Sequence, residues 1–358
     1  MVSSKKNIIG IVLGFLIILF WIFIFFSQNS IKKPIGEEKI QEEEKMNIVF
    51  ETGETEKQIK KEEFSFNCFL KQEDFNYPVA IIVDNFSEAR PVAGINKAAV
   101  IYEAPVEADI TRFMAIFSQS CLPDKIGPVR SARPYFAEWA QEYQTLFIHA
   151  GGSQEFLDKI ALNEYQIYNL DEISYNGSYF WRDKERDQPH NLYISDDAIL
   201  KFIKDKDLTK TAVPISSFIY QSELPEKNVD TNSVVSREIK INYREPVIWK
   251  FNDEIQAYQR FQNDLLFKDE EGEVITTNNL VILKTKIKVI DSIGHRSIET
   301  QGEGDALIFQ KGNFIQGKWQ KLSKNALTKF YDKNGQEIKF LPSSIWIEVV
   351  SLNHELSY

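Results

Sequence analysis

An uncharged, mostly apolar run near the N-terminus, which begins at Ile8 and ends at Phe26, constrains this 358-residue chain more than any other feature. At about 1.5 Å of rise per residue, a helix of this length spans a hydrocarbon layer of roughly 30 Å. A buried core helix would carry a polar stripe, which the run lacks. A cleavable signal peptide has small residues at its cleavage site, whereas this run ends in Phe-Ile-Phe-Phe. We therefore expect an uncleaved signal anchor.

The charges around the run give a slight orientation signal. Lys5 and Lys6 precede it, and Lys32 and Lys33 follow it. Because long domains cross membranes largely regardless of flanking charge, a cytoplasmic N-terminus and an exported body are favoured. We expect a single-pass protein of the cell membrane with an extracytoplasmic body.

The composition of the chain excludes some classes of protein. The formal net charge of −10 argues against a general nucleic-acid binder, which needs a basic face. The four histidines are far apart and no Cys-x-x-Cys occurs, so no metal-ligand spacing is present. Cys68 and Cys121 fall in the exported part, where a disulfide is expected; two buried free thiols are the alternative.

Composition and periodicity divide the chain into four segments. Residues 1–33 are the cytoplasmic tip and transmembrane anchor, and the Glu- and Lys-rich residues 34–65 form a charged stalk. Residues 66–220 alternate short apolar runs with helical segments, which predicts an α/β (α+β) domain with a mixed sheet. Residues 230–358 carry strand and turn signals almost throughout, which predicts a β-rich C-terminal domain.

Two arginines lie at the start of a predicted helix over residues 134–143. Because proline is favoured at the first helical position, Pro134 places Arg133 at the N-cap, with Arg130 and Ser131 just before it. Cations there oppose the helix dipole by some tenths of a kcal/mol, so an anion between them and the helix N–H groups would explain their presence. The alternative is internal pairing with an acidic residue. The candidates for such pairing are Glu103, Glu107 and Asp109.

A second strand-to-helix junction has a similar form. Gly151 and Gly152 could expose backbone N–H groups to a ligand, with Ser153 as the helix N-cap, or they could form a tight turn. Both junctions follow strands, at the edge where open α/β sheets bind ligands. Arg112, at the start of another predicted strand, is a third candidate cation.

A third polar stretch covers residues 180–193. Arg182, His190 and Asn191 could contribute charge, a general base and an amide, although no partner for the histidine is identifiable from the sequence. Surface ion pairs with neighbouring acidic residues are the alternative. Hydrolase-elbow, P-loop and dinucleotide motifs do not occur.

These residues resemble the YerB-like family of exported bacterial envelope proteins, built on domain of unknown function 3048. The resemblance is carried by PVAIIVDN at 78–85, residues 89–91, 101–104, 111–113 and 126–136, HAGGS at 149–153 and residues 189–193, with looser similarity at 302–304, 317–319 and 346–348. It implies an envelope location and a pair of domains, and it implies no activity. Family members are often lipoproteins, whereas this chain carries a membrane span. Where the family has two glycines after a glutamate, this chain has Ala108 and Asp109.

The stretch from Asp109 to Arg133 also resembles, in pattern only, envelope phosphotransferases of the LytR-CpsA-Psr type. That resemblance implies arginines and aspartates around a polyprenyl pyrophosphate with Mg²⁺, for which Asp84 and Asp109 would be the metal ligands here.

Our leading hypothesis is an anchored envelope protein that binds a phosphate- or carboxylate-bearing ligand, and it leaves open whether the protein is an enzyme. The candidate ligand-binding residues are Arg112, Arg130, Ser131, Arg133, Gly151, Gly152, Ser153, Arg182, His190 and Asn191. One alternative is the phosphotransferase acting on a lipid-linked glycan, with Mg²⁺. The other is a non-enzymatic structural or partner-binding envelope protein.

Overall fold

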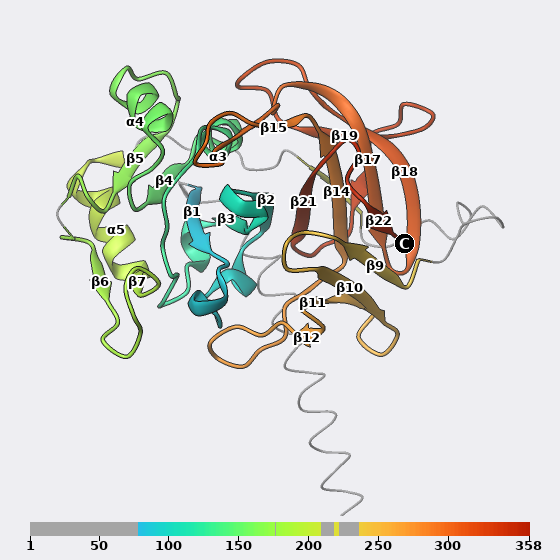
Figure 1. Ribbon diagram of the computed structural model, residues 1–358, viewed down its shortest axis with the longest axis horizontal. Helices are drawn as coiled ribbons and strands as arrows, with labels where there is room; N and C mark the ends of the chain where they lie inside the picture. Colours follow the sequence, from blue (N-terminus) through green and yellow to red (C-terminus); the bar gives the residue numbers. More distant parts are fainter. Residues whose placement is uncertain (1–77, 176, 209–217, 222–235) are drawn as a thin grey trace, which may run out of the picture. The chain divides into compact units, whose positions relative to one another are not determined.

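The computed structural model describes residues 78–175, 177–208, 218–221 and 236–358 (Figure 1). The expected anchor and stalk lie outside these residues. Within the described ranges, no helix is both long and apolar enough to cross a bilayer. All described residues belong to one compact unit, Gln58–Tyr358.

A ten-stranded mixed sheet forms the centre of this unit. Its strands, in spatial order, are β19 (Lys329–Asp332), β18 (Asn313–Lys321), β17 (Gly302–Gln310), β14 (Asn279–Thr285), β21 (Ile345–Ser351), β2 (Val100–Pro105), β3 (Thr111–Phe117), β1 (Val79–Asp84), β4 (Leu146–His149) and β5 (Tyr168–Asp171). The N-terminal half of the chain supplies β1 to β5 and the C-terminal half supplies the rest. The halves meet where β2 and β21 pair in parallel. The expectation of a mixed sheet is confirmed, and strands of the C-terminal half complete the same sheet.

Helices are few and cover the N-terminal half of the sheet. They are α3 (Pro134–Ala140), continued by η5 (Gln141–Tyr143), then α4 (Gln154–Ala161) and α5 (Asp196–Asp205). Short 3₁₀ turns are η1 (Ser87–Ala89), η2 (Ile95–Lys97), η3 (Glu107–Asp109) and η4 (Gln119–Cys121). The starts of α3 and α4 lie where the sequence predicts them, and Pro134, Ser153 and Ser195 mark the three starts as first-turn proline or serine N-cap.

The remaining strands form smaller sheets. The six-stranded sheet contains β9 (Glu238–Ile241), β10 (Val247–Asn252), β11 (Ala257–Gln262), β12 (Leu265–Leu266), β13 (Thr276–Thr277) and β22 (Leu356–Ser357). The two-stranded pairs are β15 (Ile287–Val289) with β16 (Arg296–Ile298), β8 (Ile219–Tyr220) with β20 (Lys339–Phe340), and β6 (Phe180–Arg182) with β7 (Leu192–Ile194). Strands β10 and β11 pair in antiparallel fashion as a hairpin.

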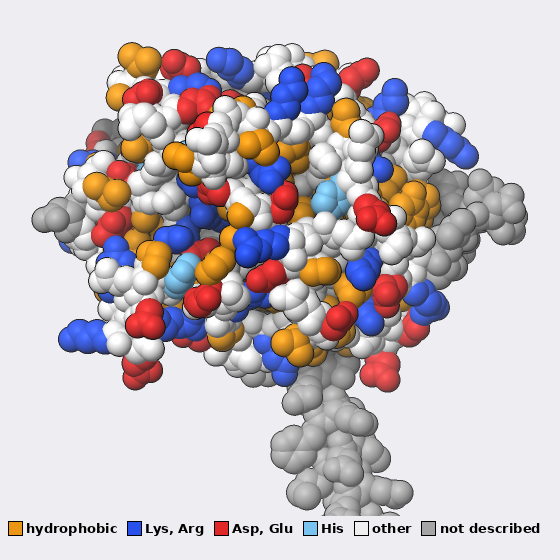
Figure 2. All heavy atoms as spheres, viewed as in Figure 1, with side chains coloured by type: hydrophobic (Ala, Val, Ile, Leu, Met, Phe, Trp, Pro, Cys, Tyr) orange, Lys and Arg blue, Asp and Glu red, His pale blue; other side chains and the backbone are white. Residues whose placement is uncertain are grey.

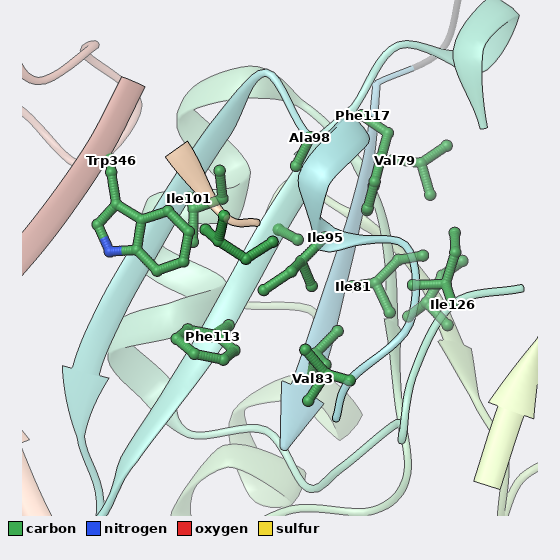
Figure 3. Packing of buried hydrophobic residues seen from close by; sticks show 14 of the residues in the cluster. Val79, Ile81, Val83, Ile95, Ala98, Ile101, Phe113, Phe117, Ile126 and Trp346 are labelled. Atoms are coloured by element: carbon green, nitrogen blue, oxygen red, sulfur yellow. The ribbon is translucent and has the colours of Figure 1, made fainter. Parts of the chain in front are cut away.

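Both faces of the central strands of the large sheet are buried, which explains the unbroken apolar sequence of β1. Val79, Ile81 and Val83 face one apolar cluster, which includes residues of α5 and of the six-stranded sheet (Figure 3). Ala80 and Ile82 face the other, which includes the aromatic residues of α3 and α4. Because successive strand side chains point to opposite faces, a strand covered on both sides needs apolar residues at every position.

A buried charge cluster lies where the two halves of the sheet meet. Glu103 of β2 and Glu348 of β21 are partners in the strand register, and both are fully buried. The guanidinium of Arg260, also fully buried, donates from Nη2 to both Glu103 oxygens, at 2.8 and 3.1 Å. Trp249 Nε1 donates to Glu348 Oε1 at 2.8 Å. One arginine thus faces two carboxyl groups.

A proton on Glu348 removes the excess negative charge of this cluster. Burial raises the pKa of Glu348 well above its ordinary value of 4.5, and the neighbouring charge of Glu103 raises it further, against the opposing effect of Arg260. Glu348 is therefore neutral at pH 7, and the cluster carries the Glu103–Arg260 ion pair and one protonated acid.

Substitutions of the two glutamates by glutamine should have different effects. Glu103→Gln leaves the buried Arg260 without its carboxylate and should lower the free energy of unfolding by about 3–5 kcal/mol. Glu348→Gln replaces a neutral acid by a neutral amide of the same shape and removes the cost of keeping a proton at pH 7, so it should raise rather than lower the free energy of unfolding. Urea unfolding at pH 7 measures both. Equal losses in the two variants would contradict the assignment of the proton.

The same proton makes stability depend on pH with a defined sign. Glu348 ionises near its ordinary pKa of 4.5 in the unfolded chain but keeps its proton in the folded one. Its contribution to stability is therefore present below that pH and is lost as the pH rises toward the folded pKa, by about 1.4 kcal/mol per pH unit. The unfolding free energy of Glu348→Gln minus that of the wild type should rise between about pH 5 and pH 8. A flat difference would show that Glu348 is ionised in the folded protein.

Candidate functional site

The candidate site forms where the parallel strands β1 and β4 separate at their C-terminal ends. The two strands pair only as far as Ile81 and Ile148. Beyond that point the segment 128–132, here called the inserted segment, lies between them. The Arg130 N–H donates to Ile82 O of β1 at 2.9 Å, and the Ala150 N–H after β4 donates to Arg130 O at 3.0 Å. Such separations of neighbouring strands are where α/β proteins place ligands.

The inserted segment brings Arg130 against the last residue of β1. Arg130 Nε lies 2.8 Å from Asp84 Oδ2, as an ion pair without hydrogen-bond geometry. The same oxygen lies 2.7 Å from His190 Nδ1, on the loop between β6 and β7. The Asp84 side chain is 3% exposed and that of Arg130 24%. One buried carboxylate therefore holds two basic groups, of which Arg130 is the more accessible.

Arg112 lies opposite Asp84 in the antiparallel pairing of β1 and β3. It is buried, and its Nη1 donates to the backbone oxygen of Ser131 at 2.7 Å. Its Nε has no hydrogen-bond partner among the described residues. Burial lowers the pKa of Arg112 to about 10, and the charges of Arg133 and Arg130 act in the same direction. The guanidinium stays charged at neutral pH in a place where further negative charge would stabilise it.

Arg133, the third arginine, is paired inside the protein. It is the N-cap of α3, as predicted. Its Nε and Nη2 each donate to Glu107 at 2.7 Å, and its Nη1 donates to Ala132 O at 2.7 Å. Burial raises the pKa of Glu107, but the hydrogen bonds and charge of Arg133 outweigh that effect and the pKa is lowered. For Arg133 the structure thus corresponds to the alternative of internal pairing.

The turn that carries Glu107 has an unusual backbone. Ala108 and Asp109 adopt φ of 56° and 57°, the left-handed region that glycine favours. Holding a residue with a Cβ in this region costs roughly 1 kcal/mol or more. Asp109 itself is paired with Arg296 Nη2 at 2.7 Å, on β16.

The glycine-rich junction after β4 is occupied by internal partners. The Gly151 N–H donates to Asp171 Oδ1 at 2.7 Å, and Ser153 Oγ accepts from the Phe156 N–H at the start of α4. A Cβ added to Gly152 would lie 2.4 Å from Phe156 Cδ1. Gly151 thus closes the turn and Ser153 caps the helix. The missing side chain of Gly152 leaves room for the Phe156 ring of that helix.

Arg182 and Asn191 support the loop that carries His190. Arg182 Nη1 donates to Asn191 Oδ1 at 3.1 Å, and Asn191 Nδ2 donates to Asp183 O at 2.8 Å. Arg186 anchors the same loop by donating to Ala89 O and Pro91 O, each at 2.8 Å. These three side chains therefore hold the loop of His190, and in the described structure none of them forms a hydrogen bond or ion pair with Arg112, Arg130 or Arg133.

The two weak metal candidates have different partners. Asp84 faces Arg130 and His190, whereas Asp109 faces Arg296. In the parts of the chain that the structure describes, no three His, Cys, Asp or Glu side chains are grouped so that they could hold a metal ion. Cys121 is disulfide-bonded, and Cys68 lies outside the described residues.

The sequence identified the arginines and His190, but it named Asp84 only as a candidate metal ligand and not as the carboxylate that joins Arg130 and His190. Asp84 and His190 are 106 positions apart, and no local pattern links them. The available signal was the polar Asp84-Asn85 pair that ends the most apolar strand, because such strand ends commonly carry functional side chains.

Comparisons with known proteins match two segments of this chain. Residues 70–209 match the "Protein of unknown function (DUF3048) N-terminal domain", and residues 238–347 match the corresponding C-terminal domain. The chain is 32% identical over 278 residues to "Putative lipoprotein YerB" of Bacillus subtilis (strain 168), covering 76% of this chain and 81% of that protein. This chain belongs to the DUF3048 family. Every candidate site residue lies in the DUF3048 N-terminal domain.

The fold also matches a solved structure. The crystal structure of YerB protein from Bacillus subtilis superimposes with a TM-score of 0.69 at 30% identity, over 79% of this chain and 94% of that one. The DUF3048 fold is therefore a mixed, sheet-rich one with few helices and two domains.

Arg130 and Arg133 should differ in their effect on stability. Arg133→Ala removes a bidentate salt bridge with Glu107 and should lower the free energy of unfolding by about 2 kcal/mol. Arg130→Ala removes one partly exposed ion pair and should cost less than about 1 kcal/mol. Chemical unfolding of both variants checks this. A larger loss for Arg130→Ala would mean that Arg130 is the structural residue of the two.

Proposed function

We propose that this DUF3048 protein is a membrane-anchored protein of the cell envelope whose N-terminal domain binds a phosphate- or carboxylate-bearing ligand at Arg112 and Arg130. The observation that carries the proposal is the buried Arg112 guanidinium, whose Nε has no hydrogen-bond partner among the described residues, beside the more accessible Arg130. A buried donor without an acceptor is costly, and an anion at this place would supply one.

Local charge supports the same conclusion. Arg112, Arg130 and Arg133 face the two carboxylates Asp84 and Glu107, which leaves one positive charge without a partner. On the face shown in Figure 2, by contrast, basic side chains are interspersed with acidic ones and form no broad basic area. A small anionic group fits this distribution better than a nucleic acid, whose phosphates need an extended basic surface.

The envelope location draws on the relative and on the N-terminal sequence. The Bacillus subtilis relative is named "Putative lipoprotein YerB". In this chain the apolar run from Ile8 to Phe26 would take the place of a lipid as a single-pass anchor, with the body outside the cytoplasm.

The non-enzymatic alternative has one observation in its favour. Arg133 with Glu107 and Arg296 with Asp109 are internal ion pairs, as expected if the charges only stabilise the fold. The two proposals differ in the role of Arg112 and Arg130, because only the anion-binding proposal gives these side chains a ligand. No observation favours the Mg²⁺-dependent phosphotransferase.

Titration calorimetry of the full-length protein in detergent with inorganic phosphate, and in parallel with citrate, tests the proposal. The wild type should bind at least one of the two anions, and Arg130→Ala should weaken binding about 10- to 100-fold, the loss expected for a charged hydrogen bond. Arg237→Ala is the matched control, because Arg237 is exposed and pairs with Asp253 away from the site. Absence of binding by the folded wild type, or equal affinity in Arg130→Ala, would refute the proposal.

A further inference from the structure

Asp84 and His190 form an oriented carboxylate–histidine pair inside the candidate site. His190 Nδ1 lies 2.7 Å from Asp84 Oδ2, and the two side chains are 13% and 3% exposed. The Phe86 ring stacks on the imidazole, with ring centroids 5.2 Å apart and planes at 13°. The imidazole is therefore held in one orientation by a hydrogen bond at its edge and an aromatic ring on its face.

This arrangement determines which imidazole nitrogen is available for chemistry. A carboxylate accepts a hydrogen bond from the protonated Nδ1, so the neutral ring keeps its lone pair on Nε2. No described residue hydrogen-bonds to Nε2. A histidine held in this way can accept a proton from a water molecule or hydroxyl group, which is the role of a general base.

Basic groups that could neutralise a phosphoryl group lie beside the same carboxylate. Arg130 approaches the Asp84 oxygen that His190 contacts, and Arg112 is the register partner of Asp84. We propose that the site hydrolyses a phosphate ester, with His190 as general base, Asp84 as its positioning residue, and Arg112 and Arg130 holding the phosphoryl oxygens. This inference depends on the anion-binding function proposed above.

The reaction balances with water as the only co-reactant. His190 Nε2 takes a proton from water while the water oxygen forms a bond to phosphorus. The bond between phosphorus and the ester oxygen breaks, and the leaving oxygen takes the proton from Nε2. The products are inorganic phosphate and an alcohol, and the two guanidinium groups stabilise the charge that develops on the phosphoryl oxygens.

The chain contains a second Asp–His pair that serves as a control. His295 Nδ1 lies 2.5 Å from Asp291 Oδ2 between β15 and β16. In the described structure, no arginine pairs with Asp291. Its Nε2 lies 3.6 Å from Glu107 Oε1, so unlike that of His190 it faces a carboxylate, and this pair should not act as a general base.

The experiment measures hydrolysis of p-nitrophenyl phosphate by the full-length protein in detergent with EDTA, together with calorimetric binding of inorganic phosphate. His190→Gln should lower kcat about 100-fold or more and leave phosphate affinity within a few-fold. Asp84→Asn should lower kcat while phosphate affinity stays equal or increases, because a competing negative charge beside Arg130 is removed. His295→Gln should keep the wild-type kcat and affinity.

The outcomes separate this inference from the proposed function. Phosphate binding without turnover, turnover that requires added Mg²⁺, or an unchanged kcat in folded His190→Gln would overturn the hydrolase assignment and leave anion binding in place. Failure of the wild type to bind phosphate or citrate would overturn both. A parallel fall in kcat and in phosphate affinity for Asp84→Asn would show that Asp84 is structural rather than positioning.

Discussion

The pairing of β2 with β21 places two glutamates side by side in the middle of a sheet that is buried on both faces. Each isolated buried charge would cost several kcal/mol, so the strands can meet only if the cluster is close to neutral. Arg260 and the proton on Glu348 provide that neutrality. Arg260 is also enclosed by aromatic rings, with the Phe267 ring centroid 4.2 Å from its Cζ. Because Glu103 lies in the segment matched by the N-terminal domain and Arg260 in the segment matched by the C-terminal domain, this buried ion pair joins the two.

The candidate site is connected to this cluster through neighbouring residues. Asn85, which follows Asp84, donates to Thr111 Oγ1 at 2.7 Å, and Thr111, which precedes Arg112, donates to Glu103 Oε1 at 2.7 Å. The ends of β1 and β3 are thus fixed on one side by the Glu103–Arg260 pair. The rigidity that a binding or catalytic site needs comes from this buried polar network rather than from the loops around it.

Local features of the sequence were sufficient to predict local structure. The apolar run 79–83 predicts a buried strand because every position meets an apolar neighbour on one face or the other. Ser153 predicts a helix start because its hydroxyl can accept a hydrogen bond from the backbone N–H three residues later, and the structure shows that bond from Phe156. The pairing of Glu103 with Arg260, 157 positions away, could not be predicted in the same way. Such contacts depend on strand order and register, which a single sequence does not display.

The difference between the predicted and observed surroundings of the arginines has a physical cause. The sequence suggested an anion held by the N–H groups at the start of the helix, but Pro134 has no N–H, and the N–H groups of Phe136 and Ala137 both point to Arg133 O. With only seven residues, α3 also has a weak dipole. An anion here would therefore have to be held by guanidinium groups rather than by the backbone. Since Arg133 already holds Glu107, that role falls to Arg112 and Arg130, which reach the same place from β3 and from the inserted segment.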